Sequence, residues 1–131
     1  MTSGEKLPSI SVVVPVFNEE QCLPEFIRRF ECFRRQAIDK IIVQAIFVND
    51  GSTDGSFEII RQIAAHSSYV KAINLSRNFG HQIAVTAGID ASMGDYVAII
   101  DADLQDPPEL IQDMYNLACQ GFDVVYGKRA L

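Results

Sequence analysis

Short apolar runs alternate with amphipathic stretches along most of the chain. The first run, Ile10–Val16, is too continuously apolar for a strand with one wet face, and further runs follow at Ile41–Val48, Val70–Leu75 and Tyr96–Ile100. Between these runs, apolar and polar residues recur at helical spacing. The alternation predicts an α/β fold, a three-layer sandwich in which a mainly parallel, Rossmann-like sheet lies between layers of helices.

Helices are expected after each of these strands. The first covers about 23–37, the second runs from a cap within 52–54 to about 65, and the third covers about 81–91. A last helix begins near Asp106–Pro108 and ends at Gly121. A further apolar run follows that glycine. In the third helix, the residues expected to face the core are Ile83, Ala84, Ala87 and Ile89.

The composition fits one globular domain. The chain has 131 residues, 48% of them hydrophobic and 21% charged, and we expect residues 1–8 to extend from a domain over 9–131. A net charge of −6 argues against a general binder of nucleic acid or anionic membranes. No apolar run approaches the ~20 residues of a membrane span, and no signal peptide is expected. Three cysteines without CxxC spacing indicate reduced thiols and a cytoplasmic location.

Three polar clusters follow the ends of predicted strands. They are Phe17–Glu20, Asn49–Asp54 and Asp101–Gln105. Ligands of open parallel sheets bind beyond the carboxyl ends of the strands, so these clusters are expected to form one site. In the second cluster, Asp50 could accept from a base N–H or a ribose hydroxyl, or bond its own turn, and Asp54 is expected to cap the following helix.

The third cluster has the chemistry of a metal site. The side chains of Asp101 and Asp103 share a face if the chain is extended there, and two like charges that close repel unless a cation lies between them. Carboxylates and the Gln105 amide are hard oxygen ligands that suit Mg²⁺ or Mn²⁺. The chain contains no GxGxxG or GxxxxGK[ST] phosphate cradle. A metal ion is therefore expected to neutralise the diphosphate of a sugar nucleotide.

Four segments resemble a known enzyme family in the same order along the chain. The likeness is to inverting, GT-A-fold glycosyltransferases that load a sugar onto polyprenyl phosphate, such as dolichyl-phosphate mannose synthases and undecaprenyl-phosphate glycosyltransferases. It covers about Ile10 to Arg129, and the run from Asp101 to Glu109, which contains an Asp-x-Asp motif, is its most specific part. The four segments are 14–20, 48–56, 76–80 and 101–109.

The resemblance implies roles for individual residues. Residues in the nucleoside pocket would be Pro15, Phe17 and Glu19, with Val48 and Asp50 on the base. Asp101 and Ala102 would border the ribose and diphosphate, and the metal would be held by Asp103 and Gln105 with help from Asp101. Arg129 would serve a phosphate. The family often has lysine where His81 stands, so a surface or partly buried histidine is the favoured interpretation there.

The resemblance also implies the partners and the reaction. The donor would be a UDP- or GDP-sugar and the acceptor a polyprenyl phosphate, at the cytoplasmic face of a membrane. The family continues well beyond Leu131 into acceptor-binding and membrane-contacting regions, so we expect a truncated GT-A fold that binds nucleotide but transfers sugar poorly by itself. A truncated sheet exposes apolar surface, which favours a homo-oligomer.

Two alternatives stay open at this point. A non-catalytic nucleotide-binding or interaction module could keep the same fold. A receiver-like or phosphatase-like domain would also have an acidic pocket, but those folds need a nucleophilic aspartate at an early strand end. Here the first strand ends Pro15-Val-Phe-Asn18 without one.

Overall fold

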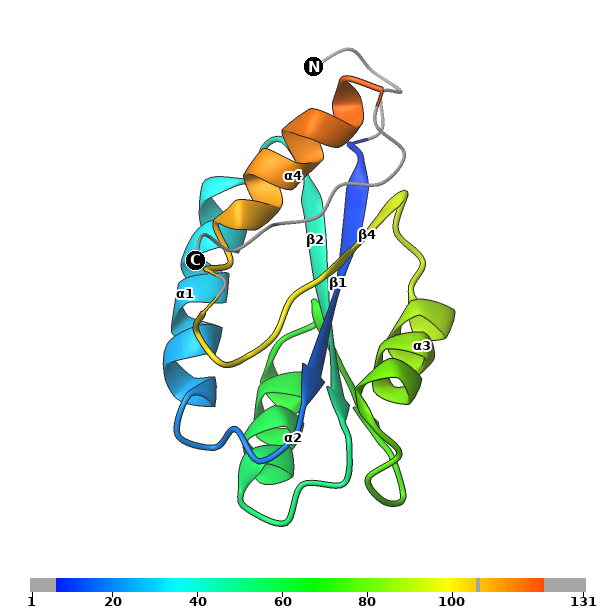
Figure 1. Cartoon of the computed structure of the whole chain (residues 1–131). Coiled ribbons are helices and arrows are strands. Elements are labelled where there is room, and N and C mark those ends of the chain that lie inside the picture. Colours follow the sequence, from blue (N-terminus) through cyan, green and yellow to red (C-terminus); the bar gives the residue numbers. More distant parts are fainter. Residues whose placement is uncertain (1–6, 106, 122–131) are drawn as a thin grey trace.

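One parallel sheet organises the chain. The computed structural model describes residues 7–105 and 107–121. Its strands pair in the order β3-β2-β1-β4, all parallel, which confirms the predicted α/β architecture (Figure 1). The elements are β1 (Ser9–Val16), α1 (Leu23–Gln36), β2 (Ile42–Asn49), α2 (Ser56–His66), β3 (Val70–Asn74), α3 (His81–Ala91), β4 (Tyr96–Ile99) and α4 (Leu110–Cys119).

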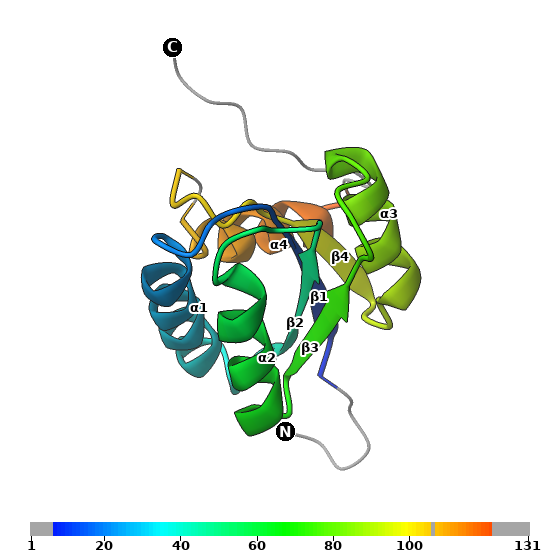
Figure 2. The same cartoon turned by 90° about the horizontal axis from the view of Figure 1, so that it is seen from below.

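Helices cover both faces of the sheet. Figure 2 shows α1, α2 and α4 on one face and α3 on the other, so the sheet is the middle of three layers. The central strand β1 is buried over almost its whole length because both of its faces are covered. Within the described residues, no helix combines the length and the apolar character needed to cross a bilayer.

Helix α1 packs through an aromatic stripe. Leu23, Phe26, Phe30 and Phe33 recur at helical spacing and are all buried against β1 and β2. Pro24 lies in the first turn, where a missing N–H costs nothing. The prediction for this helix is therefore confirmed, with its end at Gln36.

Helix α3 differs from the prediction in the face that it buries. Ala84 and Gly88 are buried against the sheet, whereas Ile83 is 50% exposed and Ile89 41% exposed. A Cβ at Gly88 would lie 2.3 Å from a methyl carbon of Val13, so the helix approaches the sheet too closely for large side chains. The small residues form the contact, and the expectation that the two isoleucines face the core was wrong.

Helix α4 starts later than expected. Leu110 and Ile111 donate to the carbonyl oxygens of Pro107 and Pro108, bonds that span three residues and form a tight turn. Pro108 therefore lies in this turn before the helix and not in its first turn. Asp106 and residues 122–131, which include the last apolar run and Arg129, lie outside the described residues.

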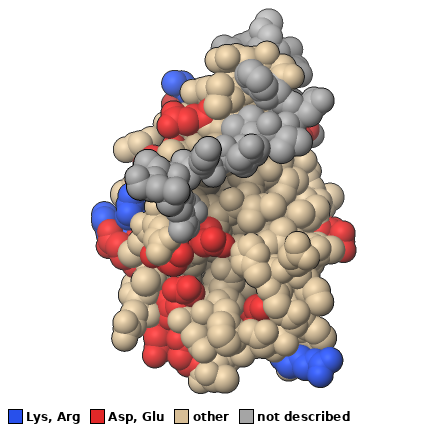
Figure 3. All heavy atoms as spheres, viewed as in Figure 1, with Lys and Arg blue, Asp and Glu red and all other residues tan. Residues whose placement is uncertain are grey.

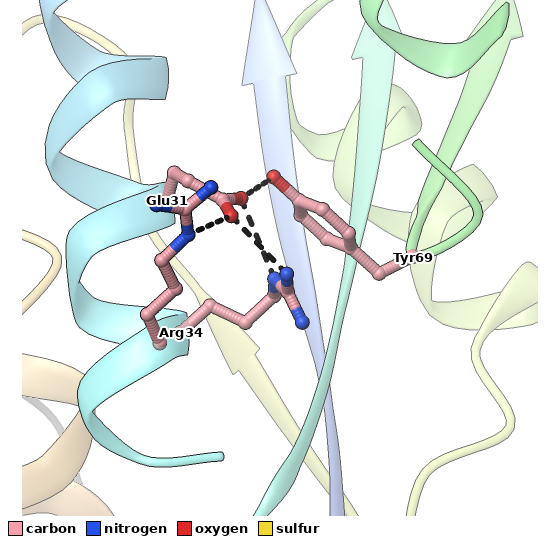
Figure 4. A network of polar contacts seen from close by, with 4 residues as sticks. Glu31, Arg34 and Tyr69 are labelled. Atoms are coloured by element: carbon pink, nitrogen blue, oxygen red, sulfur yellow. Dashed lines mark hydrogen bonds and ion pairs between the residues drawn. The ribbon is translucent and has the colours of Figure 1, made fainter. Parts of the chain in front are cut away.

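Hydrogen bonds to Glu31 connect α1 to the residue before β3. Glu31 accepts from Arg34 at 3.1 Å, from Arg35 at 2.9 Å and from the hydroxyl of Tyr69 (Figure 4). The Arg34 guanidinium lies 4.0 Å from the centre of the Tyr69 ring, which also stacks on Phe30. Burial raises the pKa of Glu31, but its hydrogen bonds outweigh burial and hold that pKa below the ordinary value.

Candidate functional site

An open hollow of about 460 Å³ lies where the carboxyl ends of β1, β2 and β4 meet. Figure 2 views the molecule from this edge of the sheet. Of the predicted site residues, the structure brings seven to its walls: Pro15, Phe17, Glu19, Asp50, Asp101, Ala102 and Asp103. Val16, Asn78, Gly80 and His81 complete the lining.

The loops after β1 and β2 are held together by side chains that bond backbone groups. Asn18 Oδ1 accepts the Thr53 N–H at 2.8 Å, and the Ser52 hydroxyl accepts the Asn18 N–H at 2.9 Å. The Gly55 N–H donates to Glu20 Oε2 at 2.9 Å. These residues build the wall of the hollow without lining it.

Asp54 serves the start of α2. Its carboxylate accepts the N–H of Ser56, the first residue of the helix, at 2.9 Å and the Glu20 N–H at 3.2 Å. It thus satisfies a free helix N–H as expected, although Gly55 occupies the N-cap position. Burial raises the pKa of Asp54, but these hydrogen bonds reverse the effect and lower it.

Asp50, after the end of β2, binds the loop that follows β3 and holds it at the edge of the sheet. Its side chain is buried, and its two oxygens accept the N–H groups of Phe79 at 2.8 Å and Gly80 at 3.1 Å. Gly51 has a φ of 71°, and a Cβ there would lie 2.2 Å from the backbone nitrogen of Asn78. The absence of a side chain at Gly51 therefore allows this close approach.

The acidic segment is bent, not extended. β4 ends at Ile99, and the chain bends from Ala102 to Gln105, with a φ of 67° at Leu104. The geometric reason given for the convergence of Asp101 and Asp103 was therefore wrong, although both line the hollow. Asp103 Oδ1 accepts the Gln105 N–H at 3.1 Å.

The hollow is strongly acidic. Acidic side chains gather at the lower left of the face in Figure 3, over the loops that follow β1 and β4. Burial is the largest cause that raises the pKa of Glu19, and the charges of Asp103, Asp101 and Asp54 raise it further. Carboxylates that repel each other in an open hollow form a place for a cation.

The donor set fits a divalent ion that is completed by phosphate. No group of three or more His, Cys, Asp or Glu side chains in the described residues could hold a metal by itself. Mg²⁺ usually keeps several waters and binds one or two carboxylates together with phosphates of the substrate. Asp101 and Asp103 supply such carboxylates, so the residues present fit an ion that arrives with a diphosphate.

Some predicted residues do not reach the hollow. Val48 is fully buried in the cluster with Val13, Ile46 and Ala84 between the sheet and α3. Gln105 is exposed beside Asp103 and does not line the hollow.

The loop after β3 supplies lining residues that sequence reasoning did not assign. Asn78 and Gly80 come from this loop, and His81 begins α3. His81 is exposed, as expected, but its Nε2–H donates to Asp101 Oδ1 at 3.1 Å. The available signal was the position of segment 76–80 directly after a strand of the same parallel sheet.

The family follows from comparison with known proteins. Residues 11–131 match the model of glycosyl transferase family 2, and the chain belongs to that family. It is 48% identical over 119 residues to the uncharacterized glycosyltransferase YkcC of Bacillus subtilis, covering 91% of this chain and 36% of that protein. It is 44% identical to an undecaprenyl-phosphate 4-deoxy-4-formamido-L-arabinose transferase of Pseudomonas savastanoi, covering 88% of this chain and 34% of the relative. The chain thus spans about a third of these relatives.

A solved structure has the same fold. The mannosyltransferase PcManGT from Pyrobaculum calidifontis, in complex with GDP-Man and Mn²⁺, superposes with a TM-score of 0.64 at 24% identity. The match covers 75% of this chain and 28% of that protein. The GT-A-like fold expected from the sequence is confirmed for this part of the protein.

Proposed function

We propose that this chain is the nucleotide-sugar-binding part of a metal-dependent, inverting glycosyltransferase. The donor is a UDP- or GDP-sugar, and the acceptor is a polyprenyl phosphate at the cytoplasmic face of a membrane. One observation carries the proposal: Asp101 and Asp103 face an open hollow at the carboxyl edge of the sheet, where burial and the charges of these two acids raise the pKa of Glu19. The arabinose transferase's undecaprenyl-phosphate name and the bound GDP-Man and Mn²⁺ of PcManGT support it.

The lining residues divide the hollow into two parts. Phe17 and Asp50, at the ends of β1 and β2, would receive the nucleoside. Phe17 is 46% exposed, which leaves an aromatic face free for a base. The carboxylates of Asp101 and Asp103 would hold Mg²⁺ or Mn²⁺ beside the diphosphate. Ala102, between them in the sequence, has a small side chain that would leave room for the diphosphate. Arg129, proposed for a phosphate, lies outside the described residues.

The chemistry needs positioning more than proton transfer. A phosphate oxygen of the acceptor attacks the anomeric carbon while the bond from that carbon to the donor diphosphate breaks, with inversion. The acceptor is already an anion, so a general base adds little. The ion, when bound, neutralises the charge that develops on the leaving diphosphate. The residues of this chain hold the donor in place for that attack.

Calorimetric titration of the 131-residue chain tests the proposal. We expect UDP or GDP to bind in the presence of Mn²⁺ and much more weakly without it. Asp103→Ala should weaken metal-dependent binding by about 100-fold or more, since even residues that only orient a metal ligand contribute about 10- to 100-fold. Asp113→Ala, on the exposed side of α4, is the matched control and should change nothing.

Two outcomes would redirect the assignment. If neither nucleotide binds with Mn²⁺, the nucleotide-sugar proposal fails. If a nucleotide binds and Asp103→Ala is indifferent, the alternative of a non-catalytic nucleotide-binding module with the same fold is favoured.

A further inference from the structure

The pairing of His81 with Asp101 suggests a role for this histidine. We propose that His81 is a positioning residue that orients the Asp101 carboxylate toward the diphosphate and its metal ion. The inference rests on the proposed function and assigns a residue of the same site. His81 comes from the start of α3 and Asp101 from the end of β4, and the distance from Nε2 to Oδ1 is 3.1 Å.

Asp101 needs such a partner because burial does not fix it. Its side chain is 41% exposed and follows the end of β4, where the chain leaves the sheet. The other aspartates of the hollow each accept a backbone N–H: Asp50 from Phe79 and Gly80, and Asp103 from Gln105. For Asp101 the described donor is the His81 side chain. Its hydrogen bond engages Oδ1 and leaves Oδ2 as the oxygen for a cation.

The position of His81 is itself fixed by the site. Gly80, the residue before it, donates its N–H to Asp50 Oδ2 at 3.1 Å. The backbone next to His81 is therefore anchored at the end of β2, and the imidazole reaches Asp101 after the end of β4. The chain of contacts runs from Asp50 through Gly80 and His81 to Asp101, and it connects the expected nucleoside end of the hollow to its metal end.

Charge also favours this arrangement. Among the described residues that line the hollow, four are carboxylic acids and His81 is the one side chain that donates from a ring nitrogen to one of them. A carboxylate that ligates a metal is commonly held by a hydrogen bond from a neighbouring side chain, and loss of that bond typically lowers metal affinity 10- to 100-fold. We expect a loss of that size for His81.

Substitutions of His81 by side chains of different length test the hydrogen bond from His81 to Asp101. Gln carries an amide nitrogen at the position of Nε2, whereas Asn is shorter and carries it near the position of Nδ1. His81→Ala and His81→Asn should weaken Mn²⁺-dependent nucleotide binding by about 10-fold or more. His81→Gln should restore most of it. His66→Ala, in the last turn of α2, is the control and should bind as the wild type does.

Two further readouts separate positioning from folding. Thermal unfolding of the His81 variants should match the wild type, because the side chain is 63% exposed. Nucleotide binding without metal should also be unchanged. If the wild type binds and all three His81 variants bind equally well with Mn²⁺, the positioning role is overturned while the proposed function stands. If the wild type itself shows no metal-dependent binding, the proposed function fails and the role of His81 fails with it.

Discussion

Two acidic residues in different parts of the molecule have opposite surroundings. Glu31, beside the start of β3, accepts from two arginines and a tyrosine, and these bonds lower its pKa in spite of burial. Glu19, in the hollow beyond the end of β1, has a pKa raised by burial and by three other acids. The first carboxylate is paired within the chain. The second lies among charges of its own sign.

These opposite surroundings indicate different roles: Glu31 stabilises the fold, whereas Glu19 belongs to the candidate binding site. The Glu31 cluster closes on itself and holds α1 against the sheet. The acids of the hollow gain nothing from each other, and they are kept together by hydrogen bonds from backbone N–H groups to side-chain oxygens in the surrounding loops. An arrangement that repels itself without a ligand is typical of a binding site, whose charges are satisfied when a cation arrives.

The largest effect is expected where the loops of the hollow approach each other most closely. Gly51→Ala should cost about 3 kcal/mol, because the methyl group meets the backbone of Asn78 and the positive φ adds strain. Gly121→Ala, just after α4, is the control: its φ is also positive, at 107°, but nothing lies within 4 Å of the added carbon. Urea unfolding should show a clearly smaller loss for Gly121→Ala. Equal losses would show that the positive φ, and not the close approach, is the reason that position 51 needs glycine.

A smaller loss in the free energy of unfolding is expected from substitution of Glu31. A group whose folded pKa is lowered stabilises the fold above its unfolded pKa, and this stabilisation is lost as pH falls through the folded value. Glu31→Gln should therefore cost about 1 kcal/mol at pH 7, and the difference from the wild type should shrink below the ordinary value of 4.5. Urea unfolding at a series of pH values measures this. A difference that grew on acidification would contradict the pairing.

Removal of a single hydroxyl isolates one bond of that cluster. Tyr69→Phe keeps the ring that stacks on Phe30 and faces Arg34, but it removes the donor to Glu31. The expected loss is about 0.5 to 1 kcal/mol in the free energy of unfolding. Tyr115→Phe on α4 is a control for the same chemical change outside this cluster. No loss for Tyr69→Phe would mean that the arginines alone hold the acid.

The smallest effect has the opposite sign. A carboxyl group with a raised folded pKa stabilises the fold below its unfolded pKa, and that contribution is lost as pH rises through the folded value. At neutral pH the charged Glu19 is therefore unfavourable, and Glu19→Gln should raise stability, by no more than about 0.5 kcal/mol. The gain in melting temperature should vanish near pH 4. Asp90→Asn, exposed on α3, should show no such gain.

The sequence predicted the fold, and the edge at which the candidate site residues gather, for clear physical reasons. Continuous apolar runs such as Ile10–Val16 indicate buried parallel strands, and polar clusters after such runs must gather at one edge. The face that α3 buries was not predictable from hydrophobicity, because close packing at Gly88 selects small side chains over Ile83 and Ile89.

The less predictable part of the site depends on long-range hydrogen bonds. Asp50 accepts N–H groups from residues 29 and 30 positions further along, and this contact brings His81 to the hollow. No local pattern reports such a pairing. The bend after β4 was missed for a similar reason, since alternation of side chains was extended beyond Ile99, where the strand ends.

Crystals grown with MnCl₂ and UDP or GDP provide the most direct measurement of the central claim. Anomalous scattering locates manganese without reference to any prior placement of ligands. We expect a peak within coordination distance of an Asp103 carboxylate oxygen and of the nucleotide's phosphates. Nucleotide bound in an accessible hollow with no manganese beside Asp103 would contradict the claim that these acids receive the donor through a divalent ion.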